Sequence, residues 1–142
     1  MRKSLIAALL LAAGLLPGQS ADPWQPFQFL IGKWKADNGA FTFLPDVKGK
    51  TVVRRNVNHT PGQEHEDLMV IYQEGGTKAI YFDSEGHVIR YTVSFPEPTK
   101  AVFDSEGPGP KYRLAYSAKG DKLEGTFEVN GKMYLQWTAV KE

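Results

Sequence analysis

Two histidines with neighbouring carboxylates are the residues of this chain best suited to acid–base or metal chemistry. The first histidine lies in the run Glu64-His65-Glu66-Asp67. If this run enters a β-strand, His65 and Asp67 share one face about 7 Å apart, close enough for the carboxylate to orient the imidazole. Such a pair would make a general base or a His–carboxylate metal site, whereas a charge run beside Pro61 and Gly62 is also typical of a solvated loop.

The second histidine flanks a turn. Asp83 and His87 stand on either side of Ser84-Glu85-Gly86, with Tyr81 and Tyr91 farther along the two arms. Asp83 and His87 could face each other as an acid–imidazole pair with phenols behind them. The interpretation that we favour is that Asp83 hydrogen-bonds its own backbone to begin the turn, while His87 is exposed.

An enzyme built on these residues would be a small isomerase or lyase with its chemistry at the barrel mouth. Its catalytic residues would be His65, Asp67 and His87, with a Tyr or Arg steadying a developing oxyanion. The chain contains no Gly-rich phosphate loop, nucleophile elbow, His-Glu-x-x-His motif or calcium loop. Whether the protein is an enzyme therefore stays open, and we prefer a binding function.

Arginines and aromatic residues on the expected strands could hold a ligand. A guanidinium offers paired donors to a carboxylate, and Tyr and Trp rings suit a hydrophobic or amphipathic molecule. The candidate ligand-binding residues are Arg54, Tyr72, Tyr81, Tyr91, Arg113, Tyr116 and Trp137. The same aromatic side chains could equally be core filling, as is usual in a small barrel.

Composition narrows the possible partners and cofactors. The chain has no Cys, which excludes thiol catalysis, covalent c-type haem and zinc–thiolate sites. Without Arg2 and Lys3 it carries 15 basic and 16 acidic residues, and such a near-neutral domain has no electrostatic footprint for nucleic acid. We expect no nucleic-acid partner, no cofactor and no resident metal, and a monomer or weak dimer.

The first twenty residues are typical of a secretory signal peptide. Met1-Arg2-Lys3 precedes the apolar segment 5–16, and Pro17-Gly18-Gln19-Ser20 supplies small residues for cleavage. The apolar segment is too short for the roughly 30 Å of a bilayer core, so we expect no stable membrane anchor. The prediction is a signal peptide over residues 1–20, a single domain over 21–142, and a periplasmic or extracellular location.

The rest of the chain reads as consecutive β-strands. Short runs rich in β-branched and aromatic residues are bounded by Gly, Pro, Asn or Asp, and Asn130-Gly131 is a strong hairpin signal. The predicted strands are 33–36, 40–44, 50–59, 67–73, 78–83, 87–95, 101–105, 112–117, 122–129 and 132–141. Short connections predict an all-β antiparallel up-and-down meander of about eight to ten strands closed into a barrel, with a helical turn near residues 24–30.

Period-2 alternation indicates which side chains share a face. His87, Ile89, Tyr91, Val93 and Phe95 fall on one face of their strand. The segment 50–59 is ambiguous, because its consecutive valines at positions 52 and 53 must point in opposite directions.

The motif Gly32-Lys33-Trp34 follows a short apolar turn and opens the meander. In this respect residues 27–141 resemble the calycin superfamily of lipocalin-like, fatty-acid-binding-protein-like and nitrobindin-like barrels, and small exported bacterial members in particular. The resemblance implies that Gly32 and Trp34 are structural, with Trp34 closing one end of a barrel that has an internal pocket. It also implies a periplasmic or secreted binding protein for a small hydrophobic or amphipathic ligand.

The chain departs from that family in two places. Lipocalins often stack an Arg from the last strand on the first-strand Trp, but segment 132–141 contains no Arg, so Lys132 or Lys141 would have to substitute. Nitrobindin-like barrels bind haem through a late His, and no His follows His87. Haem ligation of that kind is therefore not expected.

Overall fold

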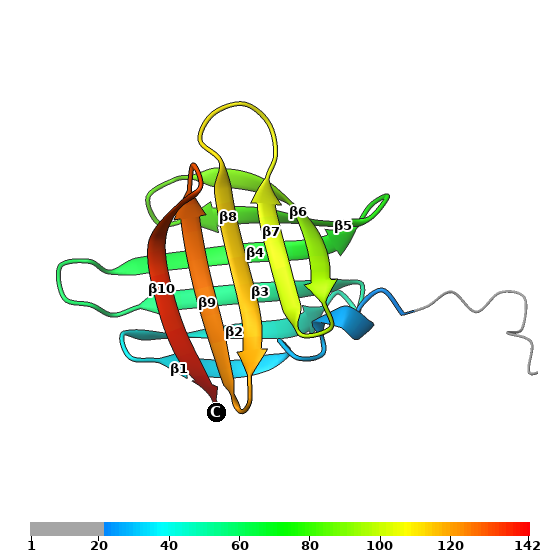
Figure 1. Cartoon of the computed structure of the whole chain (residues 1–142), viewed down its shortest axis with the longest axis horizontal. Coiled ribbons are helices and arrows are strands. Elements are labelled where there is room, and N and C mark those ends of the chain that lie inside the picture. Colours follow the sequence, from blue (N-terminus) through cyan, green and yellow to red (C-terminus); the bar gives the residue numbers. More distant parts are fainter. Residues whose placement is uncertain (1–21) are drawn as a thin grey trace, which may run out of the picture.

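Ten antiparallel strands close into one barrel in the computed structural model, which describes residues 22–142 (Figure 1). The strands are β1 (Gly32–Ala36), β2 (Gly39–Asp46), β3 (Thr51–Asn58), β4 (His65–Gln73), β5 (Thr77–Asp83), β6 (Val88–Glu97), β7 (Lys100–Ser105), β8 (Tyr112–Lys119), β9 (Lys122–Val129) and β10 (Lys132–Lys141). Before them, η1 (Gln25–Phe27) forms one turn of 3-10 helix. The all-β meander barrel predicted from the sequence is confirmed. The predicted signal peptide, residues 1–20, lies outside the described residues.

Each strand pairs with its sequence neighbours, and β1 pairs with β10 to close the barrel. The turns follow the sequence signals: Asn130 and Gly131 both have positive φ, at 51° and 79°, as a tight hairpin between β9 and β10 requires. Within residues 22–142, no helix is long and apolar enough to cross a membrane.

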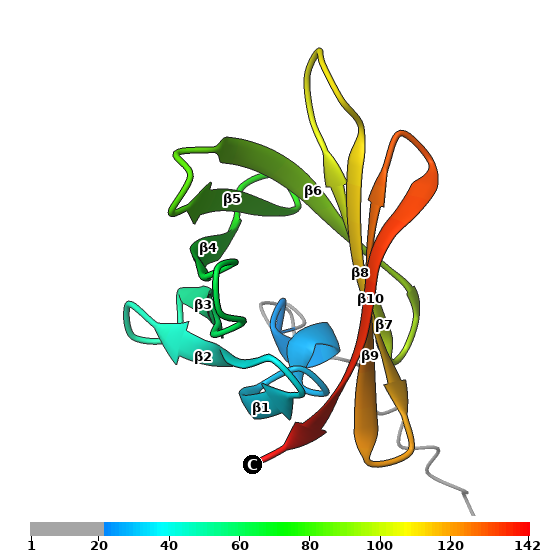
Figure 2. The same cartoon turned by 90° about the vertical axis from the view of Figure 1, so that its left-hand side faces the viewer.

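The barrel has two walls that cross each other. Figure 2 shows β1 to β5 on one side of the interior and β7 to β10 on the other, with β6 passing from one wall to the other. The closing seam is short, because only the pairs Trp34–Lys141 and Lys35–Val140 join β1 to β10. Beyond Lys35 no further residue of β1 pairs with β10.

The inner face follows the pleat of each strand. On β3, Val52 and Arg54 are buried while Val53 is half-buried and Arg55 exposed, so the even-numbered residues point inward. This settles the face of segment 50–59, which the sequence alone left ambiguous. On β6 the face carrying Tyr91 and Val93 is the buried one.

The two ends of the barrel differ in how they are filled. At one end Phe27 of η1 is fully buried and packs edge-on against Phe95 of β6, with ring centroids 4.7 Å apart. At the other end the inner side chains are only half-buried, among them Asn56, His65 and Phe127. We call these the closed end and the open end.

Trp34 ties the closed end together. Its indole Nε1 donates a 2.8 Å hydrogen bond to the carbonyl of Leu30, and the ring is buried. The Lys141 ammonium lies 5.5 Å from the centroid of the indole ring, so Lys141 makes a cation–π contact with Trp34. Gly32 has φ +136°, and a Cβ there would lie only 2.7 Å from Cε of Lys141. The absence of a side chain at Gly32 therefore leaves the space that the Lys141 side chain occupies on its way to the Trp34 ring.

We expect Trp34→Phe to destabilise the fold by about 1–3 kcal/mol, because it removes the donor to a buried carbonyl while keeping an aromatic ring. Equilibrium urea unfolding measures the difference. Trp24→Phe, the same change at a half-buried site, should cost less than about 1 kcal/mol. Equal losses in the two variants would contradict a special role for the indole N–H.

Candidate functional site

A buried arginine lies at the centre of the barrel interior. Arg54 of β3 is only 5% exposed, and its Nε donates a 2.8 Å hydrogen bond to the hydroxyl of Tyr116 on β8. Its Nη1 donates to Oδ1 of Asp67 on β4. The guanidinium carbon is 5.9 Å from the ring centroids of both Phe41 and Tyr116. Aromatic faces and one carboxylate thus replace the water that this cation has lost.

Electrostatics keep this arginine charged. Burial by itself lowers the pKa of Arg54, but the nearby Tyr116 and Asp67 outweigh it and hold the pKa above its usual range. The paired Asp67 is also buried, at 6% exposed. Removing one member of such a pair leaves the other as an uncompensated buried charge.

Asp67 links Arg54 in the core to residues nearer the open end. We call the contacting side chains of Arg54, Asp67, Asn56, His65 and Glu85 the polar chain. Its second oxygen, Oδ2, accepts a 2.9 Å hydrogen bond from Nδ2 of Asn56 and lies 3.0 Å from Nε2 of His65. The predicted pairing of His65 with Asp67 is therefore present, with both side chains on the inner face of β4. The imidazole stands at the open end, one step closer to solvent than the carboxylate.

His65 is held by carboxylates on both ring nitrogens. Nδ1 lies 2.9 Å from Oε2 of Glu85 in the β5–β6 turn, and the Tyr81 hydroxyl lies 3.2 Å from Nε2. Burial lowers the pKa of His65, but the hydrogen bond to Glu85 and the charge of Asp67 outweigh that effect and raise it. The imidazole is fixed in orientation by these contacts.

In the β5–β6 turn, Asp83 both initiates the turn and pairs with His87, two roles that the sequence alone leaves as alternatives. Its Oδ1 accepts the backbone N–H groups of Glu85 and His87, at 3.1 and 2.9 Å, as a turn-initiating Asp does. Its Oδ2 accepts the Tyr81 hydroxyl at 3.1 Å and lies 2.8 Å from Nδ1 of His87. Burial raises the pKa of Asp83, but the bonds from His87 and Tyr81 outweigh it and lower the pKa. The exposed His87 and the acid–imidazole pair thus occur together.

The remaining candidate ligand-binding residues divide between the two faces. Tyr91 and Tyr116 are buried inside, and Trp137 is half-buried on the inner face of β10. Tyr72 lies on the outer face, since its neighbour Ile71 is fully buried inside. Arg113 also lies outside, where Nε donates to Oδ1 of Asp104 at 2.7 Å. Strand alternation removes Tyr72 and Arg113 from any interior site.

Two members of the polar chain were not singled out in the sequence. Asn56 reaches Asp67 because β3 and β4 pair these two residues directly. Glu85 reaches His65 because the pairing of Asp67 with Asp83 places the β5–β6 turn beside the start of β4. The acidic turn was visible in the sequence, but its partner depends on strand register.

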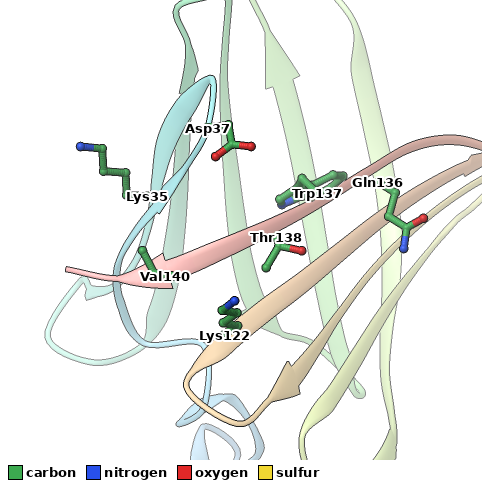
Figure 3. Close-up of a pocket in the computed structure, with 7 residues that line it drawn as sticks. All are labelled: Lys35, Asp37, Lys122, Gln136, Trp137, Thr138 and Val140. Carbon is green, nitrogen blue, oxygen red and sulfur yellow. The ribbon is translucent and has the colours of Figure 1, made fainter.

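A hollow of about 560 Å³ lies where β1 and β10 part (Figure 3). Its lining is mostly polar, with one aromatic ring. The lining residues are Lys35, Asp37, Lys122, Gln136, Trp137, Thr138 and Val140. A second hollow of about 330 Å³ lies beside it, along the β1–β2 turn and the β3–β4 loop.

Trp137 connects the hollow to the barrel core. Its ring lies over Gly125 of β9, where an added Cβ would come within 2.1 Å of ring atom Cε2. The indole also meets Tyr116 edge-on, with centroids 5.9 Å apart. Because Tyr116 binds Arg54, a continuous path of contacts runs from the hollow through the core to His65 and Glu85.

No protein-family model matches this chain, and no curated protein matches it significantly.

Arg54→Met should lower the free energy of unfolding by about 3–5 kcal/mol, because it leaves Asp67 buried and unpaired. The double variant Arg54→Met/Asp67→Leu should recover a substantial part of that loss, since both charges are then gone. Equilibrium denaturation of the wild type, both single variants and the double variant measures the coupling. Simple additivity of the two single losses would contradict a tightly coupled pair.

Stability should fall between about pH 10 and about pH 12. Burial raises the pKa of Tyr116 to about 12, against the opposing charge of Arg54, and burial also raises the pKa values of Tyr81 and Tyr91. Below pH ~10 the phenols are protonated in both states, so their contribution to stability is complete. Above it the unfolded chain loses its protons first, and Tyr116 alone costs about 2 kcal/mol by pH 12.

Urea midpoints measured across this pH range test the prediction, with phenolate absorbance reporting ionisation. Tyr116→Phe should show a shallower loss of stability than the wild type. If every tyrosine ionised near its ordinary pKa while the protein stayed folded, the burial argument would be wrong.

Proposed function

We propose that this protein is an exported, calycin-like binding protein that holds a small amphipathic molecule in the hollow between β1 and β10. The observation that carries the proposal is a hollow of about 560 Å³ that reaches an inward-facing tryptophan, Trp137. Pockets for small molecules commonly measure about 300–1,000 Å³ and combine an aromatic surface with a few polar groups. This hollow offers both.

The lining suits an amphipathic ligand better than a purely hydrophobic one. Trp137 supplies a flat apolar surface, and the lack of a side chain on Gly125 lets its ring lie flat against β9. Lys35, Asp37 and Gln136 line the same hollow with charged and neutral hydrogen-bonding groups, Gln136 from the face of β10 opposite to Trp137. A molecule with one apolar face and a polar edge would satisfy both sets.

Arg54 stabilises the residues behind the hollow and does not bind a ligand carboxylate itself. Its charge is already taken up by Asp67 and Tyr116, and its side chain is buried. A ligand anion would have to displace Asp67, which would leave that carboxylate buried and unpaired. The arginine instead supports Tyr116, on which the edge of Trp137 rests.

Acid–base catalysis at the open end is the second candidate. His65 lies 3.0 Å from the Asp67 carboxylate and faces the interior, which are the requirements that such an enzyme must meet. However, its other nitrogen is held by Glu85, so neither nitrogen is free to exchange a proton with a substrate. Catalysis would require Glu85 to move away, and for this reason we rank binding first.

The proposal also includes the location of the protein, the chemical class of its partner and its likeness to calycins. The predicted signal peptide favours a periplasmic or extracellular binding protein. The near-neutral charge favours a small molecule over nucleic acid. The Gly32-Lys33-Trp34 motif, with Lys141 over the indole, supports the calycin likeness.

Trp137→Ala should weaken binding of the amphipathic fluorophore 8-anilinonaphthalene-1-sulfonate about tenfold, equivalent to roughly 1.4 kcal/mol. The reason is the loss of the only aromatic surface among the residues lining the hollow. Fluorescence titration of the purified protein measures the affinity. Native mass spectrometry of the same sample shows whether a ligand is carried through purification.

Trp24→Phe, at the closed end, serves as the control and should bind the fluorophore as the wild type does. Urea unfolding of each variant shows that the compared proteins are folded. Equal fluorophore affinity in Trp137→Ala and the wild type, together with a bare mass in native spectra, would refute binding in this hollow.

A further inference from the structure

A cluster of one imidazole and two carboxylates lies at the open end, on the inner start of β4 and in the β5–β6 turn. Ligand atoms from His65, Asp83 and Glu85 all lie within 4.8 Å of one another. Nδ1 of His65 is 2.9 Å from the nearer Glu85 oxygen. Donor atoms of a tetrahedral site with bonds of about 2.0–2.2 Å lie about 3.3–3.6 Å apart, so any pair near the 4.8 Å limit must close by roughly 1.2 Å.

The other nitrogen of the imidazole has the support that metal-binding histidines usually have. Nε2 of His65 lies 3.0 Å from Oδ2 of Asp67, which is 6% exposed. Metal-ligating histidines almost always donate their second N–H to a carboxylate or carbonyl, and this fixes both the tautomer and the ring orientation. With Nε2–H donated to Asp67, Nδ1 is the nitrogen that can bind a metal once its proton has left, and it faces Glu85.

This support is itself anchored in the core. Asp67 is held by Arg54 through one oxygen and by Asn56 through the other. It therefore cannot easily swing out to ligate an ion, and its role is to orient His65. His65 and Glu85 stand nearer to solvent than Asp67 does, with side chains 28% and 48% exposed, whereas the Asp83 carboxylate is 5% exposed and lies beneath His87. An ion can reach His65 and Glu85 from the open end, and Glu85, which lies in an exposed turn, can move to close the site.

We propose that His65 Nδ1, Asp83 and Glu85 bind a divalent transition metal of the Zn²⁺ class. Two carboxylates balance the charge of the ion, and the neutral imidazole favours a transition metal over Mg²⁺ or Ca²⁺. The metal takes the place of the proton on Nδ1, which leaves to solvent. Three protein ligands leave at least one coordination position for water or an incoming molecule.

Asp83 must give up one present contact to join this site. Its Oδ2 lies 2.8 Å from Nδ1 of His87, and the His87 side chain is 64% exposed, so this ring can turn away at small cost. The contacts from the backbone of the turn and from Tyr81 keep Asp83 in place when His87 leaves. This proposal does not depend on whether the hollow at Trp137 holds an organic ligand.

Isothermal titration of the chelator-treated protein with Zn²⁺ is the test. We expect one ion per chain, with Mg²⁺ and Ca²⁺ unable to displace it. Glu85→Gln keeps the size of the side chain but removes its charge, and should weaken Zn²⁺ binding at least about tenfold. The matched control is Glu66→Gln, since Glu66 is an exposed neighbour on the outer face that pairs with Arg55.

A second readout separates this site from adventitious binding to an exposed imidazole. His59→Gln removes a histidine outside the cluster and should leave the affinity unchanged. In nitrogen-15 spectra, Zn²⁺ should shift the Nδ1 resonance of His65, with Nε2 remaining protonated. Absent saturable binding, unchanged affinity in Glu85→Gln, or loss of binding in His59→Gln would each overturn the proposal. Fluorophore binding at Trp137 should be the same with and without the metal, so the two proposals fail separately.

Discussion

The buried ion pair between Arg54 and Asp67 is the constraint around which the interior of this barrel is arranged. A guanidinium at 5% exposure is tolerated only if its charge and its donors are all engaged. Asp67 supplies the charge from the neighbouring strand β4, and Tyr116 supplies an acceptor from β8 on the opposite wall. One side chain therefore joins the two walls, and Phe41 and Tyr116 surround it with aromatic surface.

This pair also divides the interior into two halves. Toward η1 the inner face is apolar and ends in the Trp34 contacts with Leu30 and Lys141. Toward the open end Asp67 passes its second oxygen to Asn56 and His65, and the polar chain reaches solvent at Glu85. Asp67 is held in position by its ion pair with Arg54. The same carboxylate therefore orients the His65 imidazole without further contacts being required for that purpose.

The order of the strands and their turns could be predicted because it depends on local patterns. β-Branched runs between Gly, Asn and Asp mark the strands, and each short connection allows only an antiparallel neighbour. The pairing of His65 with Asp67 was also local, since residues two apart share a face. Side-chain type and a place on a strand predict Tyr72 and Arg113 as ligand-binding residues, but the pleat places both on the outer face.

By itself, the sequence determined the antiparallel meander and the contact between His65 and Asp67, because each follows from spacing along one strand or across one turn. Tertiary structure alone decided that Tyr116 meets Arg54, that Glu85 meets His65 and that Trp137 borders a gap between β1 and β10. These contacts depend on strand register and on where the barrel closes. Both are set by packing among residues far apart in the chain, which no local pattern encodes.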